Sequence, residues 1–170
     1  PGTPATMSFT VDSTVFVNSV NFPVRGYAID PASFSLTIGT VVVGLQSPLP
    51  ASETPYFVIR DNDPAVDGFY LSNTVDSPNG VPTNQSIGLG TLRAEYLVTY
   101  GGTTLSSLDV LAAVGTYTFT GLTNFNWVLR TGPFEVFGID FAQMTIAVDA
   151  CYPDCNASGT LTVADFGCYQ

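Results

Sequence analysis

Apolar and polar residues alternate in short runs along most of the chain. Phe34, Leu36 and Ile38, for example, are separated by Ser35 and Thr37. A period of two is that of a β-strand with one buried face. The runs are also rich in Val, Ile, Thr, Tyr and Phe, which favour strands. The strands expected on these grounds are 7–12, 14–18, 34–45, 56–60, 68–72, 87–100, 115–120, 126–131 and 135–148.

Gly, Pro, Asn and Asp separate these runs, as they do in turns. Only residues 106–113 have the pattern of a short helix. Many short strands without alternating helices favour an antiparallel sheet over a parallel α/β sheet. The sequence therefore predicts an all-β fold, an antiparallel β-sandwich, with jelly-roll and immunoglobulin-like topologies both left open.

Three segments differ in composition. Residues 1–6 form an uncharged tail rich in Pro and Thr, 7–149 the expected sandwich domain, and 150–170 an appendage that holds every cysteine. The stretch 7–20 is open to two interpretations. It could be the first part of its own sandwich, or a donor strand that adds to the sheet of the next subunit.

Charge excludes several classes of function. The chain has 14 acidic residues, four arginines, no lysine and no histidine, for a net charge of −10. Such a chain cannot neutralise a run of phosphates, so no nucleic-acid partner is expected. Histidine-dependent triads, histidine metal sites and lysine Schiff bases are excluded as well. The apolar runs are far shorter than the ~20 residues of a membrane helix, so no membrane span is expected.

The C-terminal appendage contains the spacing of a calcium loop in residues 154–165, DCNASGTLTVAD. Gly159 stands at the sixth position, where the sharp turn of such loops requires glycine. Oxygen atoms at alternate positions would converge on one Ca²⁺. The alternative is a polar turn before a helical turn, with Thr162 as N-cap. The expected metal ligands are Asp154, Asn156, Ser158, Thr160 (through its carbonyl), Thr162 and Asp165.

The segment CYPDCNASGTLTVADFGCYQ (151–170) resembles one half of a dockerin-type calcium repeat, in the cysteine-containing variant of some secreted bacterial proteins. More weakly, DNDPAVDGFYLS (61–72) and TLSSLDVL (104–111) resemble secreted β-sandwich domains of bacterial surface proteins that carry C-terminal sorting signals. The two resemblances imply export to the cell exterior, bound Ca²⁺ and no established chemistry.

Three cysteines in a chain of secreted character leave one unpaired if two form a disulfide. Cys168 paired with Cys151 or with Cys155 would join the two ends of the calcium loop segment. The third cysteine could then bond to a further segment or to another chain.

Further acidic residues offer weaker candidates. Asp61, Asp63 and Asp67 lie within seven residues and could hold a second Ca²⁺, or form an acidic turn at the Asp–Pro and Asp–Gly steps. Glu53, Glu95 and Glu135 are the only glutamates. Glu95 is expected to pair with Arg93, its same-face neighbour in a strand. No acid–base constellation converges, so we do not expect an enzyme.

Two further candidates are a glycosylation site and a group of aromatic residues. Asn84 begins an N-x-S sequon in a turn-rich stretch and is the better glycosylation acceptor of the two sequons. The aromatic residues could form a sugar-stacking platform, but as period-two residues of a sandwich they are expected mostly in the core. They are Tyr56, Phe57, Phe69, Tyr70, Tyr96, Tyr100, Tyr117, Phe119, Trp127 and Phe137.

Together these features predict a secreted, non-enzymatic structural protein. Its copies would assemble with one another into an extracellular assembly or filament by strand addition, with Ca²⁺ organising the C-terminal loop. The alternative is a carbohydrate-binding or adhesin module, whose dockerin-like tail docks to a glycan or surface partner.

Overall fold

A computed structural model describes residues 2–148 of the chain. Within this range the protein has thirteen β-strands and no α-helix, which confirms the predicted all-β class. The strands are β1 (Ala5–Ser8), β2 (Val11–Asn18), β3 (Val24–Ile29), β4 (Ser35–Ile38), β5 (Val41–Val43), β6 (Tyr56–Arg60), β7 (Val66–Ser72), β8 (Val81–Ile87), β9 (Gly90–Gly101), β10 (Gly115–Tyr117), β11 (Leu122–Thr131), β12 (Phe134–Gly138) and β13 (Met144–Ile146).

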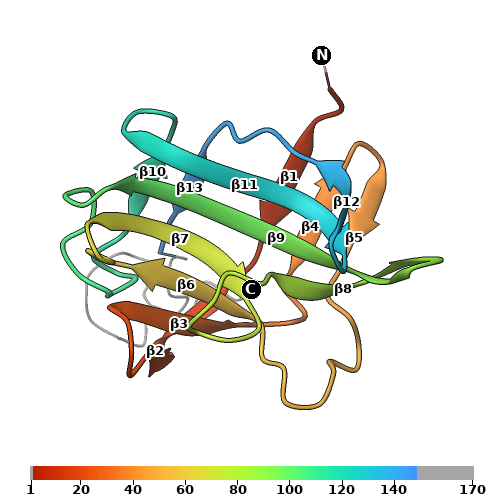
Figure 1. The fold of residues 1–170 in the computed structure, drawn as a ribbon, viewed down its shortest axis with the longest axis horizontal. Helices are drawn as coiled ribbons and strands as arrows, with labels where there is room; N and C mark the ends of the chain where they lie inside the picture. Colours follow the sequence, from red (N-terminus) through yellow and green to blue (C-terminus); the bar gives the residue numbers. More distant parts are fainter. Residues whose placement is uncertain (1, 149–170) are drawn as a thin grey trace, which may run out of the picture.

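The larger layer is an eight-stranded sheet. Seven strands follow the order β12-β11-β9-β7-β6-β3-β2, and β8 pairs with β9 beside β7. Every neighbouring pair is antiparallel. Six antiparallel steps separate β2 from β12, so these two edge strands run in the same direction at opposite edges of the sheet (Figure 1).

The second layer consists of a three-stranded sheet, β1-β4-β5, and a two-stranded sheet, β10-β13. They lie behind the large sheet in Figure 1. We call the face of the large sheet that they cover the inner face. Leu36 and Val43 of the second layer join Phe57, Phe69 and other inner-face residues in one buried cluster. The molecule is thus an antiparallel β-sandwich.

The opposite, outer face of the large sheet carries a smaller apolar cluster. Val24, Val58 and Tyr70 are buried there although no second sheet covers them. The loop between β7 and β8 supplies the cover, since Val75 packs on this cluster and its carbonyl accepts a hydrogen bond from the Tyr70 hydroxyl at 2.6 Å. The outer face is therefore partly shielded by a loop.

Several predicted strands are hairpins or pairs of strands. The run 34–45 turns at Gly39, whose φ of 60° favours glycine, and becomes β4 and β5. The run 135–148 divides into β12 and β13, which belong to different sheets. The run 87–100 contains the β8–β9 turn near its start. Strand β3 was not predicted, because Pro23 and Gly26 interrupt its pattern.

The predicted helix over 106–113 is wrong. This segment is a series of turns, in which the N–H of Ala113 reaches the carbonyl of Asp109 at 3.2 Å without further helical turns. Its apolar residues Val110 and Ala113 are buried in the core, and the Tyr27 hydroxyl accepts the N–H of Val110 at 3.0 Å. Tertiary packing on Tyr27 thus determines the backbone here.

The N-terminal segment pairs within its own chain. β1 begins at Ala5, inside the predicted tail 1–6, and pairs with β4, while β2 pairs with β3. In this single chain the segment 7–20 therefore pairs with strands of its own sandwich. The predicted appendage 150–170 lies outside the described residues. Residues 2–148 contain no helix of the length and hydrophobicity that a membrane crossing requires.

Candidate assembly edges and polar sites

The first edge of the large sheet is β2. Among the described strands it pairs only with β3, and within residues 2–148 its other side has no backbone partner. Val15 and Val17 are 54% and 48% exposed. Phe16 lies opposite the buried Tyr27, which places it on the inner face, and it is 42% exposed. The guanidinium of Arg25 lies 4.1 Å from the centre of the Phe16 ring and donates to Asn18.

The second edge is β12, which pairs only with β11 among the described strands. Phe134 and Phe137 lie opposite Thr131 and Leu129, which are buried on the inner face. Both phenylalanines are nevertheless exposed, by 58% and 46%. Val136 is exposed as well.

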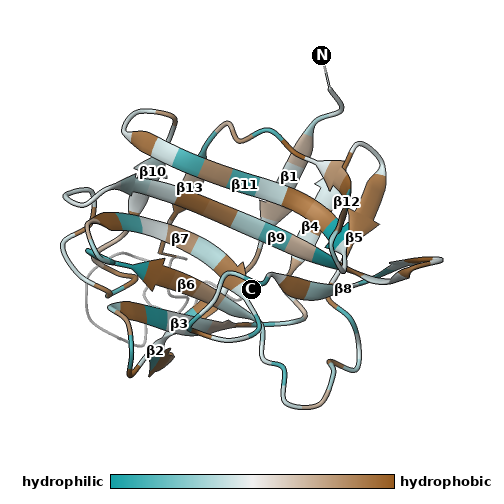
Figure 2. Cartoon of the chain, viewed as in Figure 1, coloured by the Kyte–Doolittle hydropathy of each residue, from teal (hydrophilic) through white to brown (hydrophobic). Residues whose placement is uncertain are grey.

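These two edges have few of the features that usually protect edge strands. Native sheets commonly prevent edge pairing with lysines, prolines, bulges or a covering segment. This chain has no lysine, and β2 and β12 contain a single charged residue each, Asp12 and Glu135. A register shift interrupts β2 before Phe16, and another interrupts β12 between Glu135 and Phe137, but the last three residues of β2 pair regularly. Apolar colour on β2 is visible in Figure 2. Both edges can thus accept another strand.

The outer face brings together charged residues from three strands. The register places Arg93 opposite Arg130 and Arg130 opposite Glu135, so these side chains share one face with Glu95. Arg130 pairs with Glu95 at 3.1 Å, and Arg93 pairs with Glu53 at 3.0 Å. The predicted pair of Glu95 with Arg93 is therefore wrong.

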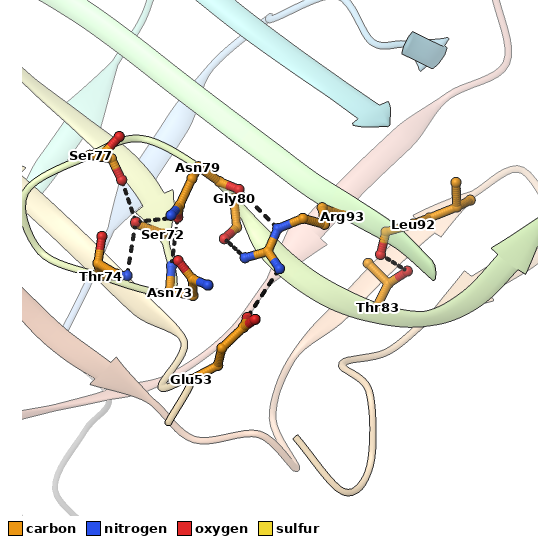
Figure 3. Close-up of polar contacts among 10 residues, drawn as sticks. All are labelled: Glu53, Ser72, Asn73, Thr74, Ser77, Asn79, Gly80, Thr83, Leu92 and Arg93. Atoms are coloured by element: carbon orange, nitrogen blue, oxygen red, sulfur yellow. Dashed lines mark hydrogen bonds and ion pairs between the residues drawn. The ribbon is translucent and has the colours of Figure 1, made fainter. Parts of the chain in front are cut away.

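Arg93 binds the β7–β8 loop and Glu53 instead of Glu95. Its guanidinium donates to the carbonyls of Asn79 and Gly80 at 3.0 and 2.8 Å, in addition to Glu53 (Figure 3). Gly80 has a φ of 68°, and a Cβ there would lie 2.6 Å from the carbonyl oxygen of Ala94. The loop therefore reaches Arg93 only with glycine at this position.

The same loop is tied internally by side-chain hydrogen bonds. The side-chain oxygen of Asn79 accepts the Ser72 hydroxyl at 2.7 Å and the N–H of Asn73 at 3.0 Å (Figure 3). In this arrangement Glu53 and Glu95 each form an ion pair with an arginine. The sequence could not show which arginine pairs with which glutamate, since Glu53 is 40 residues from Arg93.

The three aspartates of the 61–67 segment have separate roles. Asp67 is fully buried and its carboxylate accepts the N–H groups of Asn62, Thr104 and Leu105 at 2.9, 2.7 and 2.7 Å. Asp61 accepts the side-chain amide of Asn62. Residues 2–148 contain no group of three acidic, cysteine or histidine side chains arranged to hold a metal. The structure thus does not bring Asp61, Asp63 and Asp67 together as ligands.

Asn84 lies on β8 and not in a turn, contrary to its expected setting. It is exposed, and its side-chain oxygen accepts the N–H of Gly44 at 3.1 Å. Glycosylation at Asn84 stays a prediction.

Most of the aromatic residues lie in the core or in the outer-face cluster. Phe57, Phe69, Tyr96 and Trp127 are buried on the inner face, and only Phe119 and Phe137 of the ten candidates are exposed. These two belong to different parts of the chain, beside β10 and on β12. The prediction of mostly buried aromatics is confirmed.

Burial also changes the acidity of the tyrosines. It raises the pKa of Tyr100 to about 12, and it raises the pKa values of Tyr70, Tyr96 and Tyr117. The cause is the cost of a phenolate without water around it.

The expected calcium ligands and all three cysteines lie outside the described residues. They are Asp154, Asn156, Ser158, Thr160, Thr162 and Asp165, with Cys151, Cys155 and Cys168. Calcium binding and disulfide formation stay predictions.

The described residues define an antiparallel β-sandwich with two unpaired, apolar edges on one sheet. Comparisons with protein-family models, with curated proteins and with solved structures give no match. The function is therefore argued from the geometry.

Proposed function

We propose that the protein is a non-enzymatic structural subunit that builds an extracellular assembly by strand addition between copies. One observation carries the proposal: both edges of the eight-stranded sheet lack a partner among the described strands and expose apolar side chains. Each edge offers a row of backbone donors and acceptors, and pairing would satisfy them while burying Val and Phe side chains.

The few charged residues on the edge strands support this interpretation. Gatekeeping lysines are absent from the chain, and each edge strand carries one carboxylate. The strand addition proposed here uses edges that the folded chain already presents. It differs from donation of the segment 7–20, which is paired within its own chain.

The extracellular setting rests on the C-terminal sequence. A calcium loop with two carboxylates, Asp154 and Asp165, binds weakly, on the order of 10⁻⁴–10⁻³ M, which suits the calcium-rich exterior. Cysteines of the same segment fit an oxidising compartment. Calcium would organise this loop and its contacts.

Negative-stain microscopy and light scattering of the native protein, with and without a calcium chelator, test the proposal. We expect ordered assemblies in the presence of Ca²⁺. Assemblies that fray on chelation would assign the calcium loop to subunit contacts, whereas assemblies indifferent to the chelator would restrict Ca²⁺ to local stabilisation. Monodisperse single chains under both conditions contradict the proposal, and retention on polysaccharides would be measured next.

A further inference from the structure

We infer that the copies join head to tail, with β12 of one copy paired to β2 of the next. This inference rests on the proposed function and names the partner of each edge. It distinguishes a junction between unlike edges from the two junctions between like edges, β2 with β2 and β12 with β12.

Strand direction and face agree in such a junction. β2 and β12 run in the same direction within one molecule. A second copy placed beside the first in the same orientation therefore brings β12 next to β2 as a parallel pair. Phe16 and the pair Phe134 and Phe137 all lie on the inner face, so the junction would place these exposed rings in one layer. Aromatic contacts of this kind add to the area they bury.

Charge disfavours the pairing of β12 with β12. Arg25 lies against Phe16 at the β2 edge, and Glu135 lies on β12; neither forms an ion pair with another described residue. Arg25 lies on the inner face, like Phe16, and Glu135 lies on the outer face beside Arg130, so these two charges would not meet in a junction of β12 with β2. A junction of β12 with β12 would bring two Glu135 carboxylates to one seam, which is unfavourable. Asp12 lies at the other end of β2 and binds the N–H and hydroxyl of Thr14.

Such a contact repeats without closing. When β12 of each copy pairs with β2 of the next, one end of the array keeps a free β2 and the other end a free β12. The array can therefore continue in one dimension. The inner-face layer would be extended at every seam by the phenylalanines that one molecule leaves uncovered.

Single lysines on the edges test the inference. Val17→Lys is placed on β2, with Val15→Lys as a second variant of that edge, and Val136→Lys on β12. All three valines are exposed, so the fold should survive, and circular dichroism verifies this. Val42→Lys is the matched control, since Val42 is also an exposed valine but lies on β5 of the three-stranded sheet.

We expect the control to assemble like the parent chain and each edge variant alone to remain a single chain. A mixture of Val17→Lys with Val136→Lys should give one-to-one dimers, because each variant keeps the edge that the other has lost. Mass photometry or analytical ultracentrifugation measures this.

Three results overturn the inference. If each edge variant alone forms dimers that do not mix, like edges pair, and the proposed function survives without the inference. Edge variants that assemble like the parent contradict the inference and also the strand addition at these edges on which the proposed function rests. A parent chain that never assembles removes the proposed function and the inference together.

Discussion

At the scale of single residues, Asp67 is the clearest example of a polar group with a structural role. A fully buried carboxylate is costly unless hydrogen bonds replace its water. Here three backbone N–H groups do so, one from the β6–β7 turn and two from the segment that follows β9. Asp67 thus joins two loops that are distant in sequence.

Asp67→Asn should lower the free energy of unfolding by about 2–4 kcal/mol, because the amide keeps one acceptor and turns an NH₂ group toward backbone donors. Urea denaturation followed by fluorescence of Trp127 measures the change. Asp61→Asn is the control, with an expected loss below about 0.5 kcal/mol, since this carboxylate accepts only a neighbouring side chain in the structure. Equal effects of the two substitutions would contradict the assignment.

The sequence could not separate Asp67 from Asp61 and Asp63. All three occur in one acidic run, and the donors that select Asp67 at residues 104 and 105 are supplied only by the fold. The same limit applies to Glu95. From the sequence, Arg93 and Arg130 were equally possible partners, and Arg93 instead donates to the carbonyl of Gly80 in the β7–β8 loop. Local pattern predicts burial of apolar residues, but long-range partners depend on topology.

At the scale of elements, the β7–β8 loop is fastened by one side chain. Arg93 reaches two carbonyls of this loop and Glu53 from a third segment. Only the planar guanidinium, with several donors in fixed directions, can satisfy all three acceptors. Arg93 is therefore the anchor of the cover on the outer face.

Arg93→Lys should destabilise the protein by about 1–2 kcal/mol and speed amide hydrogen exchange in residues 73–80, since a single ammonium cannot replace the three contacts. Exchange followed by mass spectrometry gives the local effect. Arg60→Lys serves as the comparison, as Arg60 makes one side-chain hydrogen bond, to Thr99. Unchanged exchange in 73–80 would show that the loop is held by its internal hydrogen bonds alone.

The hydrophobic pattern of the sequence is sufficient to predict some of the strands and not others. Central strands such as β6 and β7 were predicted almost to the residue, because their apolar runs are bounded by Pro, Asp and Gly. The hairpin β4–β5 was read as one strand, since Gly39 and Thr40 do not interrupt alternation strongly. Strand β3 is buried on both faces and lacks alternation altogether. The edges that carry the proposed function follow from strand order, which no periodicity reveals.

At the scale of the whole molecule, the buried tyrosines link stability to alkaline pH. Their pKa values in the folded state are raised above the ordinary value near 10. A raised pKa means that the folded protein holds the proton more tightly than the unfolded chain. The stabilisation is therefore complete below pH 10 and is lost as the pH rises toward the folded-state values.

Titration followed by absorbance at 295 nm, together with circular dichroism, should show Tyr70, Tyr96, Tyr100 and Tyr117 ionising only as the protein unfolds above pH 10. In denaturant all eight tyrosines should ionise together near pH 10. A native protein whose tyrosines all ionise at that pH without loss of structure would contradict the burial described here.

The number of strands between the two edges has a consequence of its own. Seven strands lie on the path from β12 to β2, and an odd number of antiparallel strands leaves the outermost two pointing the same way. A filament made of unlike edges would therefore be directional, with chemically distinct termini. A factor that covers β2 alone would stop elongation at one terminus and leave the other able to grow. One strand more or fewer on the path between the two edges would make the pairing of β12 with β2 antiparallel for copies in the same orientation.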